Sequence, residues 1–143
     1  MPSLPTTRDE AEGWVRNFHR VCDTLEASLL DTVFARDATL QFGNYPVING
    51  VEGIKALLGR QFALLEEMHH KFRYGDVVGD RVYHACTISY LIKGDTKENE
   101  IEIPAAAIHH VVTEGEEKGL IKRFEVFIDN APVVQRMALF APK

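Results

Sequence analysis

The sequence predicts an α+β fold in which helices cover one face of a curved sheet. Over the first half of the chain, apolar residues recur at helical spacing. From about residue 72 onward they alternate, in segments rich in Val, Ile, Thr and Tyr, as antiparallel strands do. Turns containing glycine separate these segments. Helices followed by hairpins indicate an α+β domain rather than alternating strand–helix units.

Three helices are expected in the first half of the chain. The first follows Thr7, which can cap it in a capping box with Glu10, and its apolar face begins at Trp14. The second is expected at about residues 23–34. The third, at residues 51–68, follows the Asn-Gly turn that ends at residue 50.

Short strands are expected at residues 38–42 and 47–48, and four longer strands follow at 72–78, 81–93, 100–113 and 120–128. With 143 residues the chain is predicted to form one domain, 1–143. Residues 1–7 are interpreted as a loose N-terminal arm and residues 133–143 as a C-terminal tail.

Composition excludes several classes of function. The formal net charge is −5 and no basic cluster is present, which argues against nucleic acid as a partner. There is no apolar stretch of membrane-spanning length and no secretory leader pattern, so a cytoplasmic protein without membrane contact is expected. Cys22 and Cys86 are isolated and are interpreted as buried thiols rather than a disulfide or metal ligands.

Three segments resemble a known family. They are Phe-Ala-Arg-Asp-Ala-Thr-Leu at 34–40, Asn-Gly-Val-Glu-Gly-Ile at 49–54, and Gly-Leu-Ile-Lys-Arg-Phe-Glu-Val-Phe-Ile-Asp at 119–129. Together they resemble the SnoaL-like branch of the NTF2-like superfamily. The resemblance implies a cone: three N-terminal helices on a strongly curved, mostly antiparallel sheet of about six strands, enclosing an apolar pocket. It also implies frequent homodimers and no cofactor.

The resemblance carries over to particular residues only in part. Glu125 falls where SnoaL-type cyclases place their acid–base aspartate. His70 falls where members similar to scytalone dehydratase carry a catalytic histidine, and Asp23 lies near the aspartate of those enzymes. The ketosteroid-isomerase pattern fails, because its aspartate would fall at Phe42 and its tyrosine near Phe18. The epoxide-hydrolase pattern lacks its second acid.

Residue alternation leaves the direction of several side chains open. In the last strand, alternation favours Glu125 in solvent, whereas the family position favours the pocket, where burial would raise the pKa of its carboxyl. One residue of the pair His69 and His70 must point inward. In the strand from residue 100, alternation turns His109 inward, but a bulge at the proline of position 104 would select His110.

The sequence therefore predicts a cofactor-free acid–base enzyme, an isomerase, cyclase or dehydratase. Its expected substrate is a small hydrophobic polyketide- or terpenoid-like intermediate. A non-catalytic ligand-binding or dimeric interaction module of the same fold is the alternative. The expected catalytic residues are Glu125, His70, His109 and His110, and the expected substrate-binding residues are Tyr90, Arg123, Phe42, Phe18 and Phe127. No metal site is expected, because no pair of histidines has the helical spacing of zinc enzymes.

Overall fold

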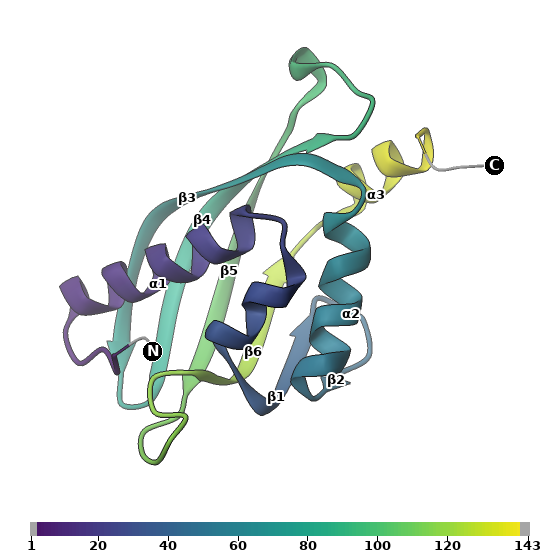
Figure 1. The fold of residues 1–143 in the computed structure, drawn as a ribbon. Coiled ribbons are helices and arrows are strands. Elements are labelled where there is room, and N and C mark those ends of the chain that lie inside the picture. The colour runs from purple at the N-terminus through teal and green to yellow at the C-terminus, as the bar shows by residue number, and fades with distance from the viewer. Residues whose placement is uncertain (1–2, 141–143) are drawn as a thin grey trace.

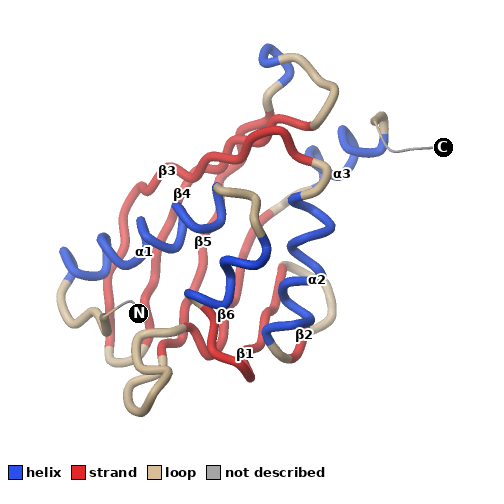
Figure 2. Tube along the Cα trace, viewed as in Figure 1, coloured by secondary structure: helices blue, strands red, loops and turns tan. Residues whose placement is uncertain are grey.

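The computed structural model describes residues 3–140, which form a curved sheet with helices α1 and α2 on its concave side (Figures 1 and 2). In chain order the elements are α1 (Arg8–Asp23), the 3₁₀ helix η1 (Ala27–Thr32), β1 (Phe34–Phe42), β2 (Ile48–Asn49), α2 (Val51–Phe62), β3 (Leu65–Val78), β4 (Arg81–Ile92), the 3₁₀ helix η2 (Lys97–Asn99), β5 (Ile101–Val111), β6 (Ile121–Ile128) and α3 (Ala131–Ala138). This architecture confirms the predicted α+β fold class.

The sheet has six strands in the order β2-β1-β6-β5-β4-β3. Every neighbouring pair is antiparallel except β1 and β6, which run parallel. The two layers bury one continuous apolar core, and side chains from α1, α2 and the concave face of the sheet contribute to it. Any cavity between the layers is therefore lined mainly by apolar side chains.

Helix α1 is fixed at its start by capping and along its length by burial. The Thr7 side chain accepts a hydrogen bond from the Glu10 backbone N–H at 3.1 Å. The Glu10 carboxylate in turn accepts from the backbone N–H of Thr6, one residue earlier than in a standard capping box. Trp14 is buried, and its indole N–H donates to the Gly119 carbonyl at 3.0 Å. Helix α1 is thereby anchored to the connection that leads into β6.

Strand β3 begins well before the predicted position. The sequence predicted a helix to residue 68, but α2 ends at Phe62 and β3 starts at Leu65. The pairing of β3 with β4 shifts register between Leu65 and Glu67, and this bulge places Leu65 and Met68 on the same buried face. Their spacing of three residues imitates a helix, which explains the error. Beyond the bulge, His70 follows Met68 on the concave side.

Other boundaries also differ from the prediction. In place of the predicted second helix the structure has only the 3₁₀ segment η1. Leu25 adopts a positive φ of 60°, which ends the helical conformation after α1. The predicted C-terminal tail contains α3, where Arg136 donates two hydrogen bonds to the buried side chain of Asp95 at 2.7 and 2.9 Å. Residues 1–2 of the predicted arm and 141–143 of the tail lie outside the described residues.

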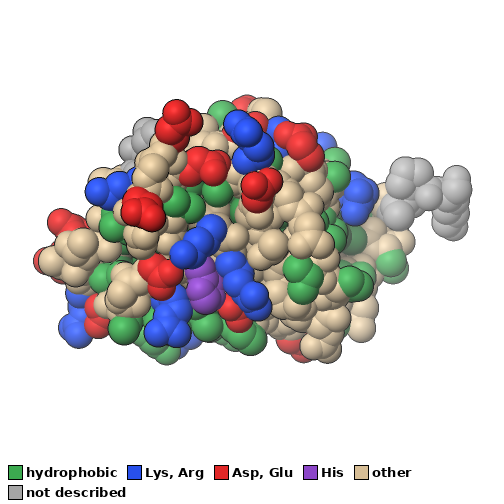
Figure 3. Space-filling model, turned by 90° about the horizontal axis from the view of Figure 1, so that it is seen from below, with side chains coloured by type: hydrophobic (Ala, Val, Ile, Leu, Met, Phe, Trp, Pro, Cys, Tyr) green, Lys and Arg blue, Asp and Glu red, His purple; other side chains and the backbone are tan. Residues whose placement is uncertain are grey.

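Charged side chains of both signs lie on the described surface (Figure 3). Acidic and basic side chains are interspersed on the face seen from below, with no broad area of one sign there (Figure 3). None of the helices described between residues 3 and 140 has the length and apolar character needed to cross a bilayer.

Candidate active site

A cavity of about 60 Å³ lies between the concave face of the sheet and helices α1 and α2. Its wall is mainly apolar and includes Phe18, Phe42 and Tyr90, three of the residues predicted to bind a ligand. Besides the Tyr90 hydroxyl, the wall has two kinds of polar group. They are the side chains of His19, His70, His84 and Gln61, and the thiols of Cys22 and Cys86. An apolar cavity with a few convergent polar groups is typical of a ligand site.

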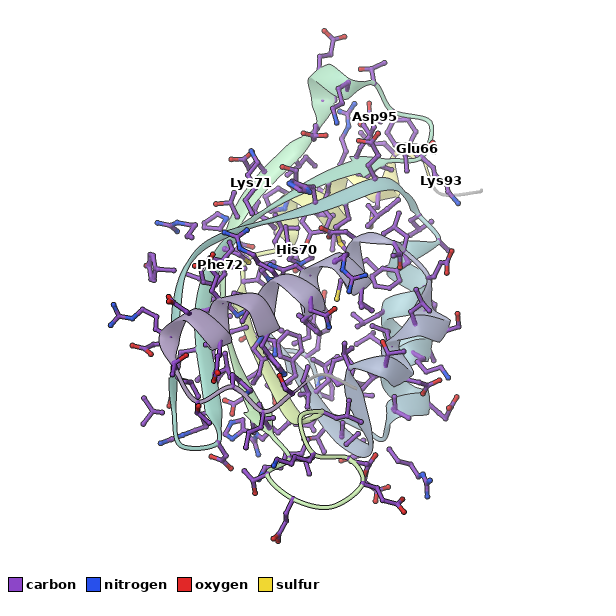
Figure 4. All side chains as sticks on the ribbon, turned by 60° about the vertical axis from the view of Figure 1, so that its left-hand side comes forward. Glu66, His70, Lys71, Phe72, Lys93 and Asp95 are labelled. Atoms are coloured by element: carbon purple, nitrogen blue, oxygen red, sulfur yellow. The ribbon has the colours of Figure 1, made fainter. Side chains whose placement is uncertain are left out.

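Asp23 and His70 form a hydrogen-bonded pair at the edge of this cavity. Asp23 is the last residue of α1, and its Oδ1 lies 2.5 Å from His70 Nδ1. Its other oxygen, Oδ2, accepts from the backbone N–H of His70 at 3.0 Å. His70 points from β3 towards α1, and its side chain is 11% exposed (Figure 4).

This pairing fixes which ring nitrogen of His70 carries the proton. A carboxylate can only accept hydrogen bonds, so Nδ1 of His70 is the donor to Asp23. The lone pair of a neutral His70 ring is then on Nε2, the nitrogen that makes no contact with Asp23. An imidazole that is oriented by a carboxylate and lines an apolar cavity has the arrangement of a general base.

Three further histidines form a buried row beside His70. The ring of His19 stacks on that of His70 with 4.5 Å between centroids. Nε2 of His19 lies 3.0 Å from Nε2 of His84, and Nδ1 of His84 lies 3.1 Å from Nε2 of His109. The row ends at Nδ1 of His109, which pairs with no group among residues 3–140.

Burial keeps these three rings neutral. It lowers the pKa of His19 to about 2 and that of His84 to about 4, with repulsion by a protonated His70 as a further cause in both cases. The pKa of His109 is held well below its usual value by burial first and by His84 next. Neutral imidazoles have one N–H each, so each N···N contact joins one donor to one acceptor.

The other polar groups of the cavity also stay protonated. Burial raises the pKa of the Cys86 thiol to about 11, and it raises the pKa values of Cys22 and Tyr90 still further. The Tyr90 hydroxyl is therefore a hydrogen-bond donor at neutral pH rather than a base. Both cysteines are buried free thiols, as the sequence predicted.

The second group of predicted residues lies on the opposite face of the sheet. Phe124 and Val126 line the cavity, so the alternation of β6 turns Arg123, Glu125 and Phe127 outward. Phe127 is 56% exposed. These three residues therefore do not contribute to the cavity wall, contrary to the predicted roles.

Glu125 interacts with another predicted residue on that outer face. Its carboxylate accepts from Nε2 of His110 at 2.8 Å and from Arg123 at 3.1 Å. The hydrogen bond from His110 is the main cause that lowers the pKa of Glu125, whereas the sequence argument for a base required a raised value. Pro104 pairs with Thr87 in unbroken register, so no bulge forms and His109, rather than His110, points inward.

Sequence reasoning missed the roles of His19 and His84. A weak signal was present for one of them, because His84 and Cys86 are two residues apart in a strand and so share a face. Nothing in the local sequence marks His19, which reaches the same place from α1. Asp23 was placed near a family aspartate only by resemblance, and the structure brings it to His70.

A second hollow of about 250 Å³ lies outside the cavity, towards α3. Its lining includes Asn130, Val134 and Met137. The two spaces share three residues, Phe42, Leu58 and Gln61, which form the partition between them.

The comparisons with known proteins agree with this fold. A family model described as a SnoaL-like domain matches residues 6–117. No curated protein matches the chain. A hypothetical protein with a ketosteroid isomerase-like fold from Catenulispora acidiphila, solved in complex with trimethylamine, is 20% identical with a TM-score of 0.70; the match covers 87% of this chain and 92% of that one.

Two further structures have the same fold. A putative SnoaL-like polyketide cyclase from Jannaschia sp. CCS1 is 12% identical, with a TM-score of 0.70 and 95% of each chain covered. An epoxide hydrolase of the LEH-like type from M. tuberculosis is 15% identical, with a TM-score of 0.68 and 92% of each chain covered. These likenesses establish the fold but not the reaction. The family match covers most of the sequence, and the chain belongs to the SnoaL-like domain family.

Proposed function

We propose that this protein is a cofactor-free acid–base enzyme that dehydrates or isomerises a small hydrophobic carbonyl compound. The observation that supports this most directly is the Asp23–His70 pair at the wall of an apolar cavity. Proton transfer next to a carbonyl needs a base of suitable strength, a donor to the oxygen and exclusion of water. The cavity supplies a candidate for each.

The reaction begins with Nε2 of His70 removing a proton from the carbon beside the carbonyl. Electrons of the broken C–H bond move towards the carbonyl oxygen, which the protonated hydroxyl of Tyr90 can stabilise by a hydrogen bond. For a β-hydroxy substrate, the C–O bond then breaks, a C=C bond forms, and the proton on His70 leaves with the hydroxide as water. For an isomerisation, His70 returns the proton to a different carbon.

The size of the cavity limits the substrate. At about 60 Å³ it is smaller than the ~150 Å³ engineered cavity that holds benzene, so only the reacting end of a substrate fits there. The remainder would occupy the outer hollow after Phe42, Leu58 and Gln61 move aside. Polyketide- or terpenoid-like intermediates with one small ring and an apolar extension fit this description.

The proposal is tested by proton exchange, which does not require the natural substrate. The protein is incubated in D₂O with a panel of small cyclic ketones and β-hydroxy ketones whose binding is first established by NMR titration. We expect deuterium to enter the carbon beside the carbonyl of at least one bound compound, and His70→Gln to abolish this. Compounds that bind without exchange or dehydration would contradict catalysis and favour the ligand-binding alternative.

Glu125→Gln provides a contrasting prediction. Because Glu125 lies on the outer face with His110, the substitution is expected to change exchange or turnover by no more than about twofold. Rates of the two proteins are compared on the same compound, with circular dichroism to establish that both are folded. A large loss of activity would restore Glu125 to the mechanism.

A further inference from the structure

One group of side chains in the cavity has the composition of a metal site. His19, His84 and Cys86 each offer one ligand atom, and these atoms all lie within 4.8 Å of one another. The three residues are buried and line the same cavity. His84 and Cys86 share a face of β4, and His19 approaches them from α1.

The distances are close to those of a four-coordinate zinc ion. Two imidazole nitrogens bound to tetrahedral zinc lie about 3.3 Å apart, and a nitrogen and a thiolate sulfur lie about 3.6 Å apart. The Nε2 atoms of His19 and His84 are 3.0 Å apart. Since no pair of ligand atoms is separated by more than 4.8 Å, side-chain adjustments of about 1 Å complete the set.

The neighbouring histidine is placed to orient one ligand. Nδ1 of His84 lies 3.1 Å from Nε2 of His109. When His84 binds metal through Nε2, its proton is on Nδ1 and is donated to His109, as a metal-bound histidine usually donates its second nitrogen. Both ligand histidines remain neutral, and only the Cys86 thiol must release its proton as the sulfur–metal bond forms.

We propose that His19, His84 and Cys86 bind one Zn²⁺ ion, with a fourth coordination position open to the cavity. Two imidazole nitrogens and a thiolate suit zinc, whereas Mg²⁺ and Ca²⁺ require oxygen ligands. Three protein ligands with one open position are characteristic of zinc ions that bind an exogenous molecule. The ligand for that position is water or a small Lewis base that enters the cavity. This binding site does not depend on the proposed function.

The test uses the full chain, stripped of metal with a chelator and titrated with Co²⁺ as a spectroscopic substitute for Zn²⁺. We expect one equivalent to bind with a thiolate-to-cobalt charge-transfer band, and Zn²⁺ to displace it. Cys86→Ser and Cys86→Ala should abolish the band and lower affinity at least about tenfold. Cys22→Ser is the matched control, because Cys22 is also a buried thiol in the cavity wall but lies outside the ligand group.

Several results would overturn the site. They are a folded wild-type protein that retains no Co²⁺ or Zn²⁺ on dialysis, binding that survives Cys86→Ser unchanged, and a band that is lost in Cys22→Ser. Circular dichroism identifies variants that fail to fold. Activity is read separately: exchange by metal-free protein supports the proposed function whatever the metal result. Exchange that appears only when Zn²⁺ is added would overturn cofactor-free catalysis and support the site.

Discussion

His70→Gln is expected to lower kcat/KM by about 10²–10⁴-fold, the usual contribution of a general base. Glutamine retains polarity and much of the volume, but it offers no nitrogen lone pair for the proton. The side-chain NH₂ group of the glutamine can still donate a hydrogen bond to the Asp23 carboxylate, so the end of α1 keeps a partner on β3. The measurement is steady-state kinetics on a compound that wild-type protein exchanges or dehydrates, with melting curves for both proteins.

Asp23→Asn tests the orientation of His70 without removing the ring. The backbone N–H of His70 requires an oxygen acceptor, now Oδ2 of Asp23. If an asparagine keeps its oxygen next to this N–H, its NH₂ group must point towards Nδ1 of His70. That is the position that Oδ1 of Asp23 occupies in the wild-type protein. That NH₂ donates to Nδ1, so the ring proton moves to Nε2, and the lone pair needed for catalysis is lost.

We therefore expect Asp23→Asn to reduce kcat by roughly 10²-fold or more, with a smaller change in KM. Asp37→Asn serves as the control, since Asp37 is an exposed aspartate of β1 far from the pair in sequence. If Asp23→Asn were as active as Asp37→Asn, the carboxylate would have no part in orienting the base. A change in KM alone would indicate that Asp23 acts in binding.

The layers of the fold could be predicted from the sequence. A helix or strand that buries one face has apolar residues at a regular spacing, and this spacing is visible in the local sequence. The inward direction of His109 also followed from alternation, since β5 has no bulge at Pro104. The same reasoning failed at β3, where a bulge between Leu65 and Glu67 places two buried residues at helical spacing. Periodicity cannot distinguish such a strand from the continuation of a helix.

The candidate site was predicted much less well than the fold, for a physical reason. Glu125 was favoured by its place in a family motif, yet its strand neighbours Phe124 and Val126 occupy the concave face. The residues that do converge come from separate elements: Asp23 from α1, His70 from β3 and His84 from β4. Their proximity depends on how α1 crosses the sheet, which is a tertiary property with no local pattern.

The site also predicts a steep loss of stability on acidification, for protein freed of metal with a chelator. His19, His84 and His109 are buried as neutral rings, and the groups facing them are His70, His69, His110, Arg16 and the protonated Cys86 thiol. None of these neighbours carries a negative charge that would stabilise a charged imidazole in the row, because burial keeps the Cys86 thiol protonated. Folded protein therefore resists protonation of the row until the pH is far below the usual histidine range.

The sign follows from proton binding. In the unfolded chain each of the three imidazoles takes up a proton as the pH falls below about 6.5. In the folded protein the pKa of His84 is about 4 and that of His19 about 2, so unfolding is coupled to proton uptake between pH 6.5 and 4. The contribution of the buried rings to the free energy of unfolding has its full value above pH 6.5, and it declines as the pH falls through this window.

The slope of the free energy of unfolding against pH gives the number of buried rings that take up a proton on unfolding. One proton taken up on unfolding corresponds to about 1.4 kcal/mol per pH unit, so three set an upper limit of about 4 kcal/mol per pH unit. Urea unfolding between pH 7 and 4.5 measures it before most carboxylates titrate. His109→Phe, which keeps a ring among Trp14, Phe18 and Phe124, should reduce the slope by about one proton.

The matched control for that slope is His69→Gln, because the His69 side chain is 66% exposed and its ring is in contact with water before and after unfolding. The slope should persist in this variant. A stability that is flat from pH 7 to 4.5 in the wild type would mean that the three rings are charged or hydrated in the folded state. That result would also remove the basis for a dry cavity, since a hydrated row beside His70 would admit water to the base and weaken the case for proton transfer there.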